Sequence, residues 1–171
     1  MLISAALTEA INQQVGREFG ASLQYVSIAS YFEAESLPRL AGFFMRQAEE
    51  EKVHALKFVH YINEAGGQVR IPAIAATRYD FKNAEEAVQA ALDWEMDVTR
   101  HINDLMELAV TEKDHLAQHF LQWFVAEQLE EVSTMSTLLG IVRRAGSQLL
   151  FVEDFLARST LGESSPPTAG E

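Results

Sequence analysis

Apolar residues recur along this chain at alternating steps of three and four, the spacing that keeps side chains on one face of an α-helix. The first such ladder runs from about residue 4 to residue 33 and includes Leu7, Ile11 and Phe32. Three more ladders cover residues 40 to 61, 88 to 109 and 117 to 142. The pattern therefore predicts four long helices and an all-α fold.

Residues that favour helix ends flank these ladders. Ser36 is a candidate N-cap for the second helix, with Pro38 in its first turn, and Asn83 begins a variant of the capping box before the third helix. Gly66 and Gly146 follow the second and fourth ladders, where glycine commonly ends a helix. Each ladder is thus expected to be a separate helix.

The connections predict how the helices run. Only a few residues join the first helix to the second and the third to the fourth, so each pair is expected to be an antiparallel hairpin. Residues 66–82 lack a helical period. A helix of about 28 residues is roughly 42 Å long, and this segment can extend to roughly 56 Å. It can therefore cross the bundle end to end, so that the second and third helices run parallel.

The C-terminal part predicts two further features. Residues 147–159, with the sequence SQLLFVEDFLARS, form a short amphipathic segment that predicts a fifth helix. It is too apolar to stand alone in water, so it is expected to be buried in a subunit junction or against its own bundle. Residues 1–160 are expected to form one domain and residues 161–171 a disordered tail.

Composition limits the chemistry and the partners. Cysteine is absent, which leaves oxygen and imidazole groups as metal ligands. A net charge of -12 with only 13 Lys and Arg residues argues against nucleic-acid binding and favours cations as partners. No apolar run approaches the length of a membrane span, and the N-terminus does not have the pattern of a signal peptide. A cytoplasmic protein is expected.

A glutamate interrupts each apolar ladder near its middle. These residues are Glu18, Glu51, Glu95 and Glu131. Burying an ionised carboxylate costs several kcal/mol, and four that face one another also repel. No Lys or Arg occupies the central positions of the ladders, whereas two divalent cations would balance four negative charges. The pattern predicts a dinuclear metal site in the bundle.

The spacing of polar residues supports the same site. His54 follows Glu51 by three positions, which places both side chains on one helical face. Shifted by 77 positions, Glu18, Glu51 and His54 become Glu95, Gln128 and Glu131. Ferritin-like dinuclear proteins use one Glu from each of two helices and a Glu-x-x-His pair from each of the other two. One pair is complete here, and its counterpart is Gln-x-x-Glu.

Four stretches of the chain resemble the non-haem bacterial ferritins, and the resemblance extends over residues 1–160. They are REFGASLQY, QAEEEKVHA, LDWEMDVT and FLQWFVAEQLEEV. The resemblance implies a ferritin-like four-helix bundle with a first iron site and a second iron site bridged by Glu51. The first would use Glu18, Glu51 and His54, the second Glu95 and Glu131, with Gln128 beside it. A further iron site would use Glu50, Glu127 and Glu130 and share Glu131.

The resemblance also implies a function. Two Fe(II) ions would be oxidised by oxygen or hydrogen peroxide, and Fe(III) would be stored as a mineral inside a homo-oligomeric cage of 24 subunits. A dinuclear-iron oxidase or peroxide-detoxifying protein without bulk storage is the alternative, and a helical scaffold with incidental buried carboxylates is a third interpretation. Haem-containing bacterioferritins carry Met where this chain has Lys52, and a second His where it has Glu131. No haem is therefore expected.

Other polar and aromatic residues have weaker assignments. Tyr25 and Trp123 lie near the predicted ligands and are candidate electron donors, with core packing as the alternative for both. His60, His101, His115 and His119 form no coherent ligand pattern. Asp114, His115 and Gln118 are candidates for lining an ion channel. The reductant and the partner for iron release are not predicted.

Overall fold

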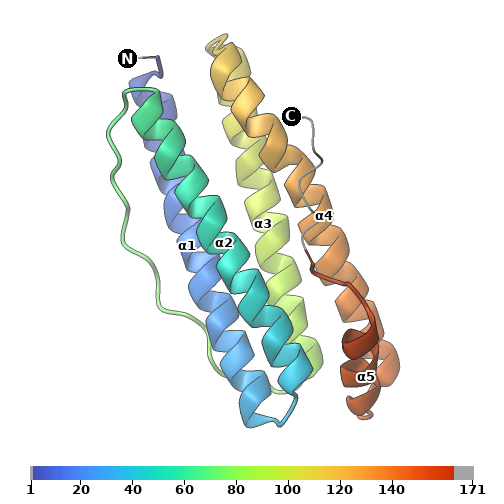
Figure 1. Cartoon of the computed structure of the whole chain (residues 1–171). Helices are drawn as coiled ribbons and strands as arrows, with labels where there is room; N and C mark the ends of the chain where they lie inside the picture. Colours follow the sequence, from blue (N-terminus) through green and yellow to red (C-terminus); the bar gives the residue numbers. More distant parts are fainter. Residues whose placement is uncertain (1, 164–171) are drawn as a thin grey trace.

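The computed structural model describes residues 2–163, in which five α-helices and no strand occur. The helices are α1 (Ala5–Ala34), α2 (Pro38–Glu64), α3 (Ala84–Thr111), α4 (His115–Ala145) and α5 (Leu150–Arg158). Helices α1 to α4 form a bundle, and α5 lies across one end of it (Figure 1). This arrangement confirms the predicted all-α four-helix bundle with a short fifth helix. None of the described helices combines the length and apolar character needed to cross a membrane.

The connections also follow the prediction. Three residues join α1 to α2 and three join α3 to α4, and each pair is an antiparallel hairpin. The crossover segment, residues 65–83, runs from one end of the bundle to the other, so α2 and α3 run in the same direction (Figure 1).

Two buried amide side chains of α1 hold the crossover segment. The amide of Asn12 donates to the Gln68 carbonyl at 2.9 Å and accepts from the Arg70 N–H at 2.7 Å. Gln24 bonds both the N–H and the carbonyl of Arg78, each at 2.8 Å. A segment without helical period therefore still has partners for part of its backbone.

Gly16 allows the crossover segment to approach α1 closely. A Cβ atom on this residue would lie 2.4 Å from Cγ of Pro72, a distance that real contacts do not reach. The two backbones can therefore pack side by side only because α1 has no side chain at this position.

The predicted N-cap of α2 is wrong. Ser36 has a φ of 61° and belongs to the end of α1, where its N–H bonds the Glu33 carbonyl. The N-cap of α2 is Leu37, whose side chain makes no capping hydrogen bond. Glu153 of α5 supplies the missing acceptor, because its carboxylate bonds the N–H groups of Arg39 at 2.8 Å and Leu40 at 2.9 Å. A negative charge at a helix N-terminus is favourable, so α5 caps α2 through space.

We expect Glu153→Ala to lower the stability of the protein by about 1–2 kcal/mol, because two N–H groups of α2 lose a charged acceptor. Thermal unfolding monitored by circular dichroism measures the change. Asp154→Asn is the matched control on the same helix, since Asp154 pairs with Arg158 at the surface, where an ion pair contributes little. Equal melting temperatures for the two variants would contradict the capping role.

The core consists of two apolar clusters stacked along the bundle. One contains Tyr25, Phe44 and Met135, and the other contains Val15 and Phe124. Between them, each of the four long helices contributes buried polar side chains instead of apolar ones. The apolar core is thus divided by one polar layer at mid-height, and this layer holds the predicted metal site.

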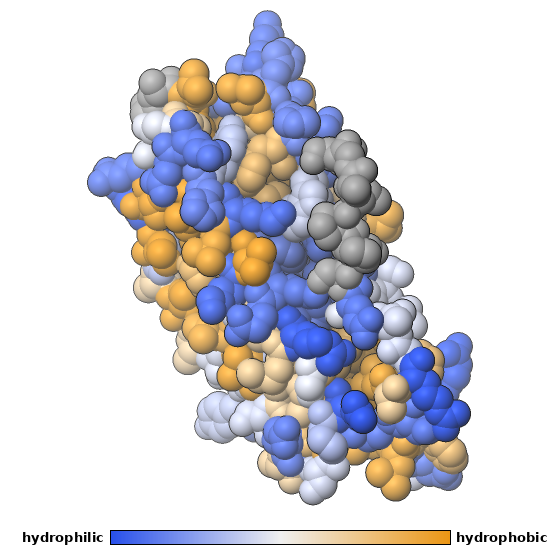
Figure 2. All heavy atoms as spheres, viewed as in Figure 1, coloured by the Kyte–Doolittle hydropathy of each residue, from blue (hydrophilic) through white to orange (hydrophobic). Residues whose placement is uncertain are grey.

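Helix α5 has one face on the bundle and one face exposed. Val152 is fully buried in the apolar cluster at that end of the bundle, whereas Leu150 and Phe151 are 76% and 65% exposed. Figure 2 shows apolar residues among hydrophilic ones at this end of the molecule. The chain then turns back at residues 160–163, where Leu161 packs against the same cluster. The rest of the predicted tail, residues 164–171, lies outside the described residues.

Candidate metal centre

Five predicted ligands from four helices meet in the polar layer. They are Glu18 of α1, Glu51 and His54 of α2, Glu95 of α3 and Glu131 of α4. None of these residues is more than 4% exposed. Ligand atoms of Glu18, Glu51 and His54 all lie within 4.8 Å of one another, and those of Glu51, Glu95 and Glu131 do the same. The two groups share Glu51, so their arrangement suits two metal ions bridged by one carboxylate.

No buried Lys or Arg side chain within residues 2–163 compensates the carboxyl groups of this layer when they ionise. No Lys or Arg occurs among the buried polar residues of the described chain. Oε2 of Glu18 and Oε1 of Glu51 are buried and have no hydrogen-bond partner. A buried acceptor without a donor is costly, and a buried anion without a counter-charge is costlier. Metal cations would satisfy both requirements at once.

The same environment shifts the pKa values of the carboxyl groups. Burial, followed by repulsion from Glu95 and Glu18, raises the pKa of Glu51 well above its ordinary value. Burial and the charges of Glu51 and Glu95 do the same to the pKa of Glu131. Burial raises the pKa of Glu95 to about 7, although hydrogen bonds from Tyr25 and Gln128 oppose the shift. The metal-free site therefore retains protons that a bound cation would displace.

Neighbouring polar groups orient two of the carboxylates. The hydroxyl of Tyr25 donates to Oε1 of Glu95, and Nε2 of Gln128 donates to Oε2 of Glu95 at 3.1 Å. Nε2 of Gln14 donates to Oε1 of Glu18 at 2.7 Å. Gln128 thus lies beside the predicted second metal position, and its amide is directed at a ligand. Gln14 was not assigned a role by the sequence, although a Gln four residues before a buried Glu on one ladder is the pattern that could have revealed it.

His54 connects the dinuclear centre to the outer carboxylates. Its Nδ1 lies 3.4 Å from Oε2 of Glu51 and its Nε2 lies 3.7 Å from Oε1 of Glu127. Burial lowers the pKa of His54, but the hydrogen bond to Glu127 and the charges of Glu18 and Glu131 outweigh this effect, so the pKa is raised overall. Glu127, Glu131 and His54 also form a third close group of ligand atoms.

The residues predicted for the further iron site lie together. Glu50, Glu127 and Glu130 line one small cavity with Glu131, on the side of the centre formed by α2 and α4. Figure 2 shows hydrophilic residues across the middle of this face.

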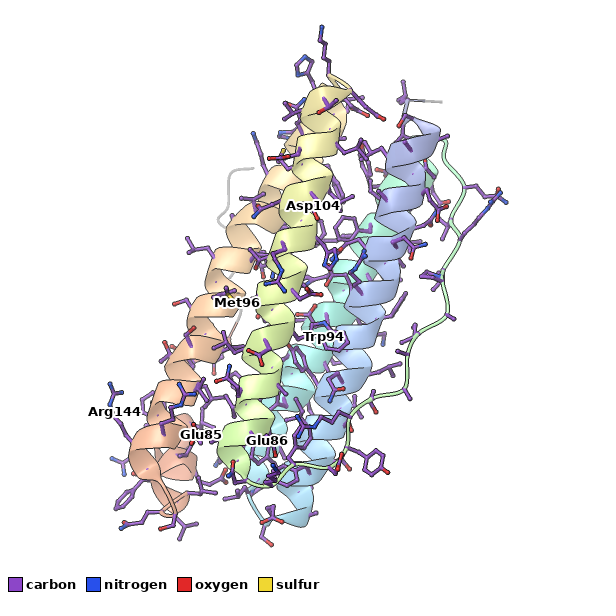
Figure 3. All side chains as sticks on the ribbon, turned by 180° about the vertical axis from the view of Figure 1, so that it is seen from behind. Glu85, Glu86, Trp94, Met96, Asp104 and Arg144 are labelled. Atoms are coloured by element: carbon purple, nitrogen blue, oxygen red, sulfur yellow. The ribbon has the colours of Figure 1, made fainter. Side chains whose placement is uncertain are left out.

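Two tryptophans lie on different sides of the bundle near the polar layer. The ring of Trp123 packs edge-on against His54, with centroids 5.4 Å apart, and the Nζ atom of Lys57 lies 3.5 Å from the Trp123 ring centroid. Trp94 points from α3 toward α1 (Figure 3). A Cβ atom added to Gly20 of α1 would lie 3.2 Å from the Trp94 ring. Trp123 thus contacts a predicted ligand, and Trp94 covers the α1–α3 side.

The remaining histidines and the candidate channel residues lie elsewhere. In the described part of the chain, His60, His101, His115 and His119 belong to no close group of three metal-binding side chains. His60 and His119 line an apolar pocket of about 580 Å³ between α2 and α4. Asp114 caps α4 by accepting from the Ala117 N–H. These contacts give Asp114 a structural role, and its role in a channel stays a prediction.

The fold and the polar layer define a class: four-helix bundles that hold a dinuclear metal site between facing carboxylates. A family model described as Ferritin-like domain matches residues 8–145. The relative Ferritin BfrB of Mycolicibacterium smegmatis is 43% identical over 159 residues, which cover 93% of this chain and 88% of the relative. The bacterial non-heme ferritin of Staphylococcus aureus is 37% identical over 145 residues, covering 85% and 87%.

Solved structures agree with these relatives. An open pore ferritin from the hyperthermophilic archaeon Archaeoglobus fulgidus superimposes with a TM-score of 0.89 at 32% identity, covering 92% of this chain and 98% of the other. The chain therefore belongs to the ferritin family, as its resemblance to the bacterial ferritins predicted. Membership supports iron storage as its function and iron as the metal that it binds.

Proposed function

We propose that this protein is a ferroxidase that oxidises Fe(II) to Fe(III) and stores the product as a ferric mineral inside a cage of 24 copies. The observation that carries the proposal is the sharing of Glu51 between two buried ligand groups, Glu18–Glu51–His54 and Glu51–Glu95–Glu131. Two ions held in this way would be close enough to react together with one oxidant molecule.

The ligand chemistry favours oxidation of the bound substrate ions. Carboxylate oxygens are hard and anionic, so they stabilise Fe(III) more than Fe(II) and lower the potential of the couple. Two Fe(II) ions supply two electrons, and one oxygen molecule that accepts them with two protons becomes hydrogen peroxide. Because a buried site excludes water, the carboxylates keep their full electrostatic effect on the ions.

The two metal positions differ in their surrounding side chains. Glu51, Glu95 and Glu131 would hold the second ion, and the neutral amide of Gln128 lies beside it, bonded to Glu95. Further carboxylates lie beyond Glu131 on the α2–α4 side, where Glu50, Glu127 and Glu130 line a small cavity with it. We propose that Fe(III) leaves the centre along these outer carboxylates.

Aerobic addition of Fe(II) to the purified assembly tests the proposal. We expect rapid oxidation followed by a soluble ferric core inside a particle whose mass corresponds to 24 chains, measured by light scattering and electron microscopy. A small oligomer that oxidises iron but lets it precipitate would instead support a dinuclear oxidase without storage. No oxidation above the rate of buffer would refute both functions.

The exposed face of α5 is proposed to hold the cage together. Leu150 and Phe151 project from this helix into solvent while Val152 anchors it to the bundle. Large exposed apolar side chains next to each other are typical of a subunit contact. The number of subunits and the cytoplasmic location stay predictions.

We expect the double variant Leu150→Asp, Phe151→Asp to dissociate the cage while the helix content of each chain stays unchanged, because both side chains are exposed in the single subunit. Sedimentation velocity gives the particle size and circular dichroism gives the helix content. Deletion of residues 147–171 should have the same effect on size. An intact cage in the double variant would show that α5 serves only its own bundle.

A further inference from the structure

The small cavity that Glu50, Glu127 and Glu130 line lies next to the dinuclear centre, on its α2–α4 side. Its volume of about 10 Å³ is enough for roughly one ion or water molecule. Side chains of α2 and α4 form most of its wall, and the segment that follows α5 forms the rest. The lining residues are Gln47, Glu50, Glu127, Glu130, Glu131, Thr134, Gly162 and Glu163.

We infer that Glu163 is a ligand of a third metal ion in this cavity, so that the segment after α5 is part of the metal-handling site. This inference rests on the proposed function and extends it. It assigns to Glu163 a role that the sequence pattern did not suggest, because residues 161–171 read as a disordered tail.

A buried side chain indicates that the cavity takes a cation. Gln47 is only 1% exposed, and within residues 2–163 its Oε1 atom is buried without a hydrogen-bond partner. Its Nε2 atom donates to Glu50, which leaves the carbonyl oxygen as the free end of the amide. Among the described residues that line the cavity there is no Lys or Arg. An oxygen-lined space with an unpaired buried acceptor and several carboxylates suits a hard cation.

The fold brings Glu163 to this place by specific contacts. After α5 the chain turns back toward the middle of α4 (Figure 1). Leu161 packs on the apolar cluster, and the Glu163 N–H bonds the Thr160 carbonyl at 3.0 Å. Gly162 has a φ of 71°, and a Cβ atom there would lie 2.4 Å from the ring of Phe43. Only glycine fits this turn without strain, so the position of Glu163 is fixed by its neighbours.

The position of Glu163 also differs from that of the inner ligands. Glu163 is exposed, whereas Glu131 on the opposite wall of the cavity is 4% exposed. The cavity therefore has one wall in the dinuclear centre and one wall at the surface. A metal ion held there would lie between the dinuclear centre and the outside of the α2–α4 face. Water would replace Glu163 as a ligand more easily than it would replace the buried carboxylates.

Calorimetric titration of the assembled, metal-free protein with Zn²⁺ tests this inference without depending on oxidation. We expect three zinc ions per chain in the wild type. In Glu163→Gln the weakest of the three should bind about 10-fold less tightly, and the other two should be unchanged. Gly162→Ala should have the same effect, because the added methyl group displaces the turn. Glu49→Gln is the control, since Glu49 is an exposed glutamate of α2 outside the cavity.

Zinc binding in Glu163→Gln and in Glu51→Gln tests the role of Glu163 and the dinuclear centre separately. Unchanged binding of the third ion in Glu163→Gln would overturn the role of Glu163, whatever happens at the dinuclear centre. Loss of the two tighter ions only in Glu51→Gln would support the dinuclear centre independently. If Glu51→Gln leaves all zinc binding unchanged, the proposed function itself fails.

Discussion

Replacing Glu51 by Gln should slow the initial rate of Fe(II) oxidation by about 100-fold or more. Glu51 is the one residue shared by the two inner ligand groups, so a neutral amide weakens both metal positions at once. Glutamine has nearly the same shape as glutamate, and the bundle should therefore assemble normally. Stopped-flow absorbance under air, at two Fe(II) ions per chain, measures the rate.

Matched variants define what this result means. Glu49→Gln removes the same charge from an exposed position two residues away. This variant should oxidise iron at the wild-type rate. Glu18→Ala and His54→Ala each remove a side chain from only one of the two inner ligand groups, so these variants should slow oxidation less than Glu51→Gln does. An unchanged initial rate in Glu51→Gln would refute the bridging role.

The helices could be predicted because their burial depends on a local repeat. Steps of three and four place Leu7, Ile11 and Phe32 on one face, and all three are fully buried in the structure. The short links between hairpins left only antiparallel pairs. The parallel α2 and α3 followed from the length of the crossover segment alone, since a chain of that length reaches the far end of the bundle.

The features that could not be predicted depend on contacts between distant parts of the chain. Ser36 before a proline looked like an N-cap, but the cap of α2 comes from Glu153, more than 100 residues later. The crossover segment has no pattern of its own, and its conformation is set by Asn12 and Gln24 of α1. Glu163 reaches the metal-binding face only because the chain reverses at Gly162.

The inner ligands were placed by chemistry, and their surroundings were not. A buried Glu on each of four ladders indicated a cation, and the structure brings candidate ligand atoms of these residues within 4.8 Å of one another in two groups. The hydrogen bonds around them are unequal. Gln14 and Tyr25 lie in the first half of the chain and donate to Glu18 and Glu95, respectively. Ala91 and Ile102, which cannot donate from their side chains, occupy the matching positions 77 residues later. The two halves therefore share ligand positions but differ in the groups that orient them.

The polar layer separates two apolar clusters, so it must weaken the metal-free bundle. Buried carboxyl groups that ionise cost more than the apolar side chains that could fill the same space. Metal binding would recover this cost, which ties folding to metal. The site is therefore expected to make the stability of the protein depend on pH and on metal together.

The metal-free protein should lose stability as pH rises from about 5 to about 8. The pKa of Glu95 rises from 4.5 in the unfolded chain to about 7 in the fold, and those of Glu51 and Glu131 also rise. In this pH range the folded state binds more protons than the unfolded state, so raising the pH favours unfolding. For Glu95 alone the shift corresponds to on the order of 3 kcal/mol.

Glu95→Gln removes one of these protons and should flatten the dependence. Chemical denaturation of metal-free wild type and variant, at equal protein concentration and at several pH values, measures the difference. Above pH 7 the variant should be the more stable protein, and near pH 5 the two should be similar. Zn²⁺ should stabilise the wild type more at pH 8 than at pH 5 and the variant much less at either pH, because the bound cation replaces the protons that the carboxyl groups hold. A wild type whose stability rises with pH over this range would mean that the buried carboxyl groups ionise without cost.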